Sequence, residues 1–434
     1  MTKKWIYCLY AVMAVTALIA VVLLTNPFRF NEPSLPSTSA PVQDPTVPTD
    51  NIPIPDVRLY QCDTTRAAIW QELAKAYTEA TGIPVTILTP KDDDCEGTPI
   101  EALSGKYGAT IFCLHHTHEL QERQDFCLDL TGTEIAGQLQ QDIFALKNGD
   151  TIAGVAFNVE SYGIIYNRYL LASAGYTVAS NDIKDFSSFS NAVKDITTNK
   201  RKLGFSAFAA PDLGNTDHGA LLCLLAGLTD DEAVLRSFWD LYIQNCTRSG
   251  SKLTQSSKED GQNEFLDKKA VFYLGGTWDF IDIDIDITHD PELDLCFMPV
   301  LINTQQEQPG LYYSNTGYWC VNSQADEMDI QASLDFLNWL VTAQEGETAP
   351  ADRLEYLMPF QDTAYASNPL AASALESMKS SQDNISWTSC DTLTPELLRR
   401  FGDALIAYTK DPTDETWAAL AALQPSPETK TPEA

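Results

Sequence analysis

The sequence predicts an α/β protein with two lobes, preceded by a transmembrane helix. Three observations support this prediction. The chain has 434 residues, 44% of them hydrophobic, which is enough to bury two ordinary cores. A strand pattern, a helix pattern and a second strand pattern follow one another between residues 57 and 89. Residues 5–25 contain no charged side chain.

The apolar run at 5–25 has the length of a membrane-spanning helix. At 1.5 Å per residue it would extend over roughly 30 Å, the thickness of a bilayer core. Lys3 and Lys4 precede it, so the positive-inside rule places the rest of the chain outside the cell. No small-residue cleavage site or lipid-carrying cysteine follows the run. We expect an uncleaved anchor over 1–30; the alternative is a cleaved signal peptide with a poor site.

The predicted anchor is followed by a linker. Residues 31–56 contain seven prolines and no apolar period, which is typical of a semi-rigid polyproline segment. Residues 424–434 have the composition of a disordered tail. The folded part is therefore expected to occupy about 57–423.

Charge and cysteine content exclude several classes of protein. The formal net charge of −32 repels nucleic acid and anionic lipid headgroups. Nine of the ten cysteines lie beyond the predicted anchor, so at least one thiol is expected to be free or intermolecular. There is no CxxC pair, which excludes a zinc ribbon or a thioredoxin-type site.

The first lobe is predicted from strand and helix signals. Strands are expected at 57–62, 83–89 and 109–114. A helix is expected over 66–82, with Thr64 or Thr65 capping its start and Gly82 its end. In an open parallel sheet, ligands bind beyond the carboxyl ends of the strands. Asp63 and the HHTH stretch at 115–118 follow two of these strands, so both are expected to line a cleft.

The second lobe is predicted to begin with a strand and helix over 162–176. Helical patterns dominate after it. Strands are again expected at 294–300 and 317–323, followed by an amphipathic helix over 328–346.

The order of these landmarks resembles the extracellular solute-binding proteins of bacterial ABC importers, specifically the maltose-binding-protein-like, carbohydrate-type family 1. The resemblance runs from residue 57 to about 423, through WQELAKAYTEATGIPV, GDTIAGVAFNVESYGIIYNRYLLASAGY, EFLDKKAVFYLGGTWDF, LCFMPV, GYWCVNS and ASLDFLNWLVTAQEG.

The resemblance implies a periplasmic-binding-protein-like fold with a hinge between its lobes. Lobe 1 would take about 57–160 and 296–345, and lobe 2 about 161–295 and 346–423. A protein of this family captures a small solute, here most simply an oligosaccharide, by hinge closure, and delivers it to the transmembrane subunits of an ABC permease. Neither a cofactor nor catalytic activity is expected.

Candidate ligand-binding residues follow from the chemistry of sugars, which have an apolar ring face and a polar rim. In GGTWDF at 275–280, Trp278 can stack on such a face while Asp279 accepts hydrogen bonds. Trp319 offers a second ring, although it has the alternative of a buried strand position. The carboxylate and amide groups of Asp63, Asn158 and Glu160 are further hydrogen-bond candidates. Ala109 stands where many relatives have Asp, so the family's sugar contacts do not transfer there.

The HHTH stretch has three interpretations. His115 and His116 can contact solute at the rim of the cleft, the stretch can be a plain polar loop, or His116 and His118 can bind zinc with Glu119 or a distant cysteine. No second histidine pair completes a metal site, so no metal is predicted. The aspartates of 279–294 alternate with isoleucine as in a half-buried strand and lack the glycine and distal glutamate of a calcium loop.

Enzyme and signalling functions remain as alternatives. GxSxG, HExxH, P-loop and GxGxxG motifs are absent from the sequence. A glycoside hydrolase needs only two placed carboxylates, so it stays open. A ligand-sensing or adhesive module with the same fold, and a zinc-binding receptor, also stay open.

Overall fold

The computed structural model describes residues 54–90, 97–115, 119–178, 182–213, 231–279, 290–301, 312–342, 350–361, 363, 369–380, 385–386 and 394–423. The chain divides into two units, 1–53 and 54–434, and all the described residues belong to the second. The predicted anchor, most of the linker, the aspartate–isoleucine repeat and the tail lie outside the described residues. Within those residues, no helix is both long and apolar enough to cross a membrane.

One mixed sheet organises the described part of the chain. Its main order is β2-β1-β3-β9-β5-β7-β6, while β4 and β8 also pair with β5, and β10 pairs with β9. The strands are β1 (Val57–Tyr60), β2 (Val85–Leu88), β3 (Ile111–Leu114), β4 (Ala145–Asn148), β5 (Thr151–Asn167), β6 (Ser206–Phe208), β7 (Ala270–Gly276), β8 (Leu295–Met298), β9 (Tyr312–Val321) and β10 (Ile385–Ser386).

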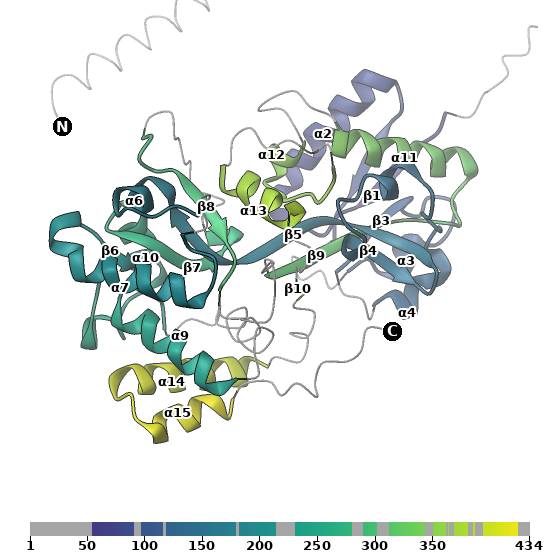
Figure 1. Ribbon diagram of the computed structural model, residues 1–434. Coiled ribbons are helices and arrows are strands. Elements are labelled where there is room, and N and C mark those ends of the chain that lie inside the picture. The colour runs from purple at the N-terminus through teal and green to yellow at the C-terminus, as the bar shows by residue number, and fades with distance from the viewer. Residues whose placement is uncertain are drawn as a thin grey trace, which may run out of the picture. The chain divides into compact units, whose positions relative to one another are not determined.

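Helices flank this sheet (Figure 1). They are α2 (Ala67–Thr81), α3 (Ile100–Leu103), α4 (Leu120–Arg123), α5 (Glu134–Gly137), α6 (Arg168–Ser173), α7 (Phe186–Leu203), α9 (Glu232–Gln244), α10 (Lys258–Leu266), α11 (Glu327–Thr342), α12 (Pro350–Leu354), α13 (Pro369–Ser380), α14 (Pro395–Lys410) and α15 (Asp414–Ala421).

The first lobe has the strand–helix–strand start that the sequence predicts. β1 is parallel to β2 and β3, and both β1 and β3 are fully buried. The α2 helix buries one face, formed by Trp70, Leu73, Ala74 and Tyr77, because these residues recur at helical spacing. Gly82 ends α2 with a φ of 77°, as expected.

The second lobe has its own core. The second half of β5 pairs with β7 and β8, and β6 lies parallel to β7. Phe189, Phe208, Phe238 and Phe272 are among the large side chains that this core buries completely. Two hydrophobic cores therefore exist, and the chain is two-lobed as predicted.

The positions of β8 and α12 bear on the lobe boundaries that the resemblance implies. β8, which the resemblance places largely in lobe 1, pairs with Ile164–Asn167 of β5, and its side chains alternate between the first core (Leu295, Phe297) and the second (Cys296, Met298). α12 follows residue 346 and was assigned to lobe 2, but it packs on α2 and α11 of the first lobe. Backbone pairing and helix packing, which the sequence does not display, set these positions.

β5 is a single strand that belongs to both lobes. Sequence periodicity predicts a strand only from residue 162, whereas β5 begins at Thr151 and continues to Asn167. Val155 and Phe157 contribute to the first core, while Ile164 and Tyr166 contribute to the second. β9 runs antiparallel to β5 from Val155 to Tyr162, across the boundary between the two cores (Figure 1). The two strands connect the lobes.

Candidate functional site

Three chain segments meet where the lobes join, and we call this region the crossing. It consists of 157–159 in β5, 315–317 in β9 and 356–358, which follows α12. β5 and β9 change register on both sides of Asn158. The Val159 backbone N–H donates to the Leu357 carbonyl oxygen at 2.9 Å, which attaches the third segment. The crossing is therefore where a hinge between the lobes would lie.

The side chain of Asn158 links all three segments. Its Nδ2 donates to Thr316 Oγ1 at 3.1 Å, and its Oδ1 accepts from the Leu357 backbone N–H at 2.8 Å. Thr316 Oγ1 in turn donates to the Asn158 carbonyl oxygen at 3.2 Å. The sequence predicts that the Asn158 amide binds a ligand, but in the structure both its nitrogen and its oxygen form hydrogen bonds within the protein. Glu160 lies opposite Ser314 and is half-buried.

His115 presents an acceptor at the end of β3. Its Nδ1 lies 3.0 Å from the Thr316 carbonyl oxygen. Because a carbonyl oxygen only accepts, we assign the proton to Nδ1, which leaves Nε2 as an acceptor. This Nε2 is buried and has no hydrogen-bond partner among the described residues. His116, the other predicted histidine contact, and His118 lie outside those residues.

Asn315 presents a second acceptor in β9, one residue from Thr316. Its Nδ2 donates to the Tyr318 hydroxyl at 2.8 Å. Its Oδ1 is buried and, like His115 Nε2, has no hydrogen-bond partner within the described part of the chain. Buried polar atoms normally have a partner, and these two acceptors are among the buried side-chain atoms to which the described part of the chain supplies none.

Trp278 supplies a partly exposed aromatic face on the second-lobe side. It lies in a short 3₁₀ turn, η6 (Thr277–Asp279), directly after β7. Its ring is tilted by 30° to that of Tyr162 in β5, with 5.8 Å between the ring centroids. A Cβ on Gly276 would stand 2.4 Å from the Trp278 ring, so only glycine at 276 allows the ring to lie this close to the backbone.

Asp279 does not offer its carboxylate to a ligand in this structure. The side chain is 6% exposed, and Oδ1 forms an ion pair with Lys258 Nζ at 2.6 Å. Oδ2 accepts from the Gly276 backbone N–H at 2.8 Å. The prediction that Asp279 binds solute is therefore replaced by a structural role: its carboxylate fixes the turn that carries Trp278.

Asp63 is also occupied by the protein itself. It caps η1 (Thr64–Arg66), the turn before α2, through the Thr65 and Arg66 backbone N–H groups. The start of α2 itself, at Arg66, has no side-chain cap, so the expected cap by Thr64 or Thr65 is not formed. Oδ2 accepts from the Tyr356 hydroxyl at 2.8 Å and from Arg66 Nη1 at 3.1 Å. Burial alone would raise the pKa of Asp63, but hydrogen bonds from Thr65, Tyr356 and Arg66 lower it below its usual value.

Replacing Asp63 with Asn should lower the free energy of unfolding by about 1 to 2 kcal/mol at pH 7, because charge-assisted hydrogen bonds are lost at a partly exposed site. The pKa of Asp63 is lowered in the folded state. Its contribution is therefore complete above the unfolded pKa, about 3.9, and disappears as the pH falls through the folded value. Urea titrations from pH 7 to pH 3 should show the two proteins converging at acid pH.

Asp403→Asn is the control for this comparison, because Asp403 is exposed and pairs only with Arg399 at the surface among the described contacts. A loss in Asp63→Asn no larger than that in Asp403→Asn, or one that stays constant down to pH 3, would contradict the structural role of Asp63.

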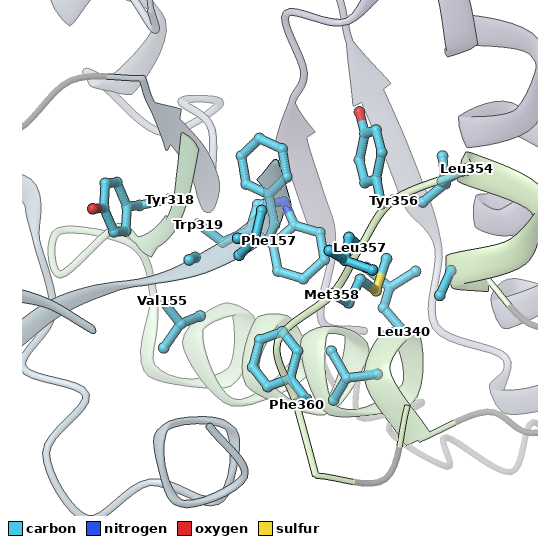
Figure 2. Close-up of a cluster of buried hydrophobic side chains, with 14 of the residues drawn as sticks. Val155, Phe157, Tyr318, Trp319, Leu340, Leu354, Tyr356, Leu357, Met358 and Phe360 are labelled. Atoms are coloured by element: carbon cyan, nitrogen blue, oxygen red, sulfur yellow. The ribbon is translucent and has the colours of Figure 1, made fainter. Parts of the chain in front are cut away.

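Trp319 is a core residue, which corrects its prediction as a solute contact. It has no exposed surface. Its ring stacks on Phe157, with centroids 5.3 Å apart and an interplanar angle of 24°, and meets the edge of Trp70 at 6.3 Å. Figure 2 shows this ring among Phe157, Leu357 and Met358. Solute has no access to it in this conformation.

A metal centre is not formed by the residues that the structure describes. No group of three or more His, Cys, Asp or Glu side chains there could hold a metal ion. The zinc interpretation rests on His116 and His118, and thus falls outside the described range.

Three residues near the crossing escaped the sequence analysis: Tyr162, Asn315 and Tyr356. Tyr162 pairs with Gly276 across β5 and β7, which brings it beside Trp278. Asn315 directly precedes Thr316 in the NTGYW stretch, where only Trp319 was considered. Tyr356 is far from Asp63 in the sequence, so no local signal identifies their contact. Of the three, only Tyr162 could have been found from the sequence: pairing the predicted strand at 162 with the GGTWDF strand would have placed it beside Trp278.

The fold and the crossing define a two-lobed binding protein. The chain belongs to the family of bacterial extracellular solute-binding proteins, whose pattern matches residues 72–376, and the resemblance noted in the sequence is thereby confirmed. No curated protein sequence matches the chain.

Solved structures with the same fold include three sugar-related or family 1 receptors. The apo form of RafE from Streptococcus pneumoniae has a TM-score of 0.60 at 12% identity, covering 87% of this chain and 98% of its own. A family 1 solute-binding protein from Bifidobacterium longum subsp. infantis has a TM-score of 0.54 at 17% identity, covering 85% of this chain and 97% of its own. The bacterial solute receptor AcbH, described as preferring β-D-galactopyranose, has a TM-score of 0.58 at 16% identity, covering 86% of this chain and 97% of its own. These identities establish a common fold only.

Proposed function

We propose that this protein is a membrane-tethered receptor that captures an oligosaccharide by hinge closure and delivers it to the transmembrane subunits of an ABC permease. Membership of a family of extracellular solute-binding proteins supports a domain that faces outside the cell. The apolar run at 5–25 and the proline-rich segment after it supply the tether.

The observation that carries the carbohydrate assignment is the pair of buried acceptors, His115 Nε2 and Asn315 Oδ1. An acceptor buried without a partner costs about 1–3 kcal/mol, so a ligand that donates to both atoms recovers that free energy. Sugar hydroxyl groups are donors that carry no charge. A neutral polyol therefore suits this region of an acidic protein better than an anion does.

An aromatic face on the second-lobe side of the crossing supports the same assignment. Trp278 is partly exposed beside Tyr162, and an apolar sugar ring face packs well on such a surface. Asn315 pairs with Val159, and Tyr162 lies three residues beyond Val159 in β5, a distance of roughly 10 Å along a strand. A ligand that contacts both the acceptors and Trp278 must be longer than one sugar ring, which favours an oligosaccharide. RafE, a structural neighbour, has been solved in complex with raffinose.

Hinge closure follows from the arrangement of the crossing. Solute held by one lobe makes further contacts when the other lobe approaches, and the closed state gains population according to its extra affinity. Asn158 takes part as a residue of the hinge itself. Glu160, and His116 at the rim, remain proposed ligand contacts.

A thermal-shift screen of residues 54–434 tests this function. The panel should contain raffinose, other oligosaccharides, galactose, amino acids, peptides, and zinc with and without EDTA. A ligand at 100 times its Kd adds about 2.7 kcal/mol of stability, which raises the Tm by a few degrees. We expect this rise with an oligosaccharide. A rise with zinc alone, reversed by EDTA, would instead make the HHTH stretch a metal site and contradict the carbohydrate assignment.

A further inference from the structure

Two cysteines of the first lobe, Cys127 and Cys320, lie together although they are far apart in the sequence. Cys127 forms an antiparallel bridge with Asn322, flanked by a hydrogen bond from Leu128 N–H to the Val321 carbonyl oxygen at 2.8 Å. Cys320 is two residues before Asn322, on the same face of the strand. Cys127 therefore lies diagonally across from Cys320, and its thiol donates to the Arg123 carbonyl oxygen at 3.5 Å. Both are free thiols in this structure.

We propose that Cys127 and Cys320 are a disulfide-forming pair, which oxidises to a cross-link between the start of the 127–130 segment and β9. The domain belongs to an extracellular family, and disulfides persist in that environment. Cys62 is already disulfide-bonded, so this chain forms such bonds. The proposal is independent of which solute the protein binds.

The surroundings of Cys320 limit its choice of partner. Side chains alternate between the two faces of a strand, and Cys320 stands opposite Phe112 in the β3–β9 pairing. Cys113 is therefore on the other face, where its thiol lies 3.9 Å from Gln61 Oε1. On its own face, the Cys320 sulfur occupies space that Gly154 leaves free, because a Cβ there would lie 2.8 Å from Sγ. Cys127 is thus the thiol placed to react with it.

Accessibility and acidity give the two thiols different roles. Cys127 is partly exposed, whereas Cys320 is fully buried. The hydrogen bond from Cys320 lowers the pKa of the Cys127 thiol, while burial raises the pKa of Cys320 well above its usual value. A small oxidant can therefore reach Cys127, which is also the more readily ionised of the two.

The reaction balances as two thiol–disulfide exchanges with a low-molecular-weight disulfide such as oxidised glutathione. The Cys127 thiolate attacks one sulfur of the oxidant, forms a mixed disulfide and releases one thiolate. Cys320, as thiolate, then attacks the Cys127 sulfur and releases the second. Two electrons pass from the cysteines to the oxidant, and the two cysteine protons end on the two released thiols.

The cross-link would close the loop from 127 to 320, which contains all of β5 and most of the second-lobe core. A disulfide restricts the unfolded chain, and the restriction grows with the length of the enclosed loop. Oxidation should therefore raise the Tm by several degrees. Because β9 carries Asn315 and Thr316, it would also anchor the strand that forms one side of the crossing.

The test uses the full chain in detergent, oxidised with oxidised glutathione or reduced with dithiothreitol. Peptide mapping by mass spectrometry should find a peptide pair joined at Cys127 and Cys320 only in the oxidised sample. The Tm should fall on reduction. In Cys127→Ser the peptide pair joined at Cys127 and Cys320 should be absent. The difference in Tm between the oxidised and reduced samples should then fall to the part that the Cys62 disulfide contributes. Cys246→Ser, which removes a buried free thiol of the second lobe, should keep the full change.

Two results would overturn the proposal. One is a protein that, after complete oxidation, carries Cys127 only as a glutathione adduct or as a free thiol. The other is a Cys127–Cys320 peptide accompanied by the same Tm change in wild type and Cys127→Ser, since the bond would then not constrain the fold. Peptide mapping reads the bond directly, so it remains informative even if a variant is less stable.

Discussion

Replacing Trp278 with Ala is expected to weaken oligosaccharide binding by about 30-fold or more. Buried aromatic contacts, and tryptophans above all, dominate binding free energies, and their truncation commonly costs at least about 2 kcal/mol. Trp278 is suited to this role because η6 presents its ring beside Tyr162 while part of its surface stays exposed. The measurement is isothermal titration calorimetry with the best oligosaccharide from the thermal-shift screen.

Two further variants make this result specific. Trp278→Phe keeps a smaller ring and should lie between wild type and Trp278→Ala. Tyr169→Ala removes an aromatic side chain of the second lobe that is 45% exposed and belongs to α6, and it should leave the affinity unchanged. If Trp278→Ala is folded and binds as tightly as Tyr169→Ala does, Trp278 is not a contact residue and the aromatic part of the site must be sought elsewhere.

The fold of the first lobe was predictable because its signals are local. α2 has apolar residues at helical spacing and ends at a glycine, and β3 is an uninterrupted apolar run. β5 was predicted only in part, because its polar residues around Asn158 interrupt the apolar pattern in the middle of the strand. Those residues pair with β9 and with the segment after α12, and long-range pairing of this kind has no signature within a short window of sequence.

The sequence could predict which types of residue are suited to bind a ligand, but not which of them are already bonded within the protein. Aspartates beside glycines or after a strand are good ligand groups, but the same chemistry suits capping and ion pairing. Asp63 caps the turn before α2, and Asp279 pairs with Lys258. Sequence order gives some warning for Asp63, since an aspartate just before a helix is a frequent N-cap. Trp319 was ambiguous because a strand aromatic points to either face, and pairing with β3 places it on the buried one.

These differences change the view of how the lobes are connected. Groups first assigned to ligand prove to hold the connecting segments: Asp63 accepts from Tyr356, and Asn158 accepts from Leu357. The segment after α12 is thereby held to β5 and to the turn that follows β1. A hinge needs such fixed points, since closure is a rotation about segments that keep their own contacts. The acceptors that we propose for solute, on His115 and Asn315, have no partner among the described residues.

Replacing Asn158 with Ala is expected to lower the free energy of unfolding by about 2 to 4 kcal/mol. The change leaves the Leu357 N–H without an acceptor, which costs about 1–3 kcal/mol, and removes the hydrogen bond to the Thr316 hydroxyl, which costs about 0.5–1.5 kcal/mol because that hydroxyl still donates to the backbone carbonyl of residue 158. Unfolding in urea, followed by tryptophan fluorescence, measures the loss. The fluorescence of Trp319, next to the crossing, also reports on local loosening.

Asn158→Asp separates the two hydrogen bonds. At neutral pH its carboxylate still accepts from the Leu357 N–H but no longer donates to Thr316, although the threonine hydroxyl can turn to donate to it. Its stability should therefore lie between wild type and Asn158→Ala. Asn199→Ala, on the exposed face of α7 where the amide bonds only to Asp195 among the described contacts, should stay within about 0.5 kcal/mol of wild type. If Asn158→Ala unfolds at the same urea concentration as Asn199→Ala, the amide does not hold the crossing together, and the hinge must depend on backbone pairing alone.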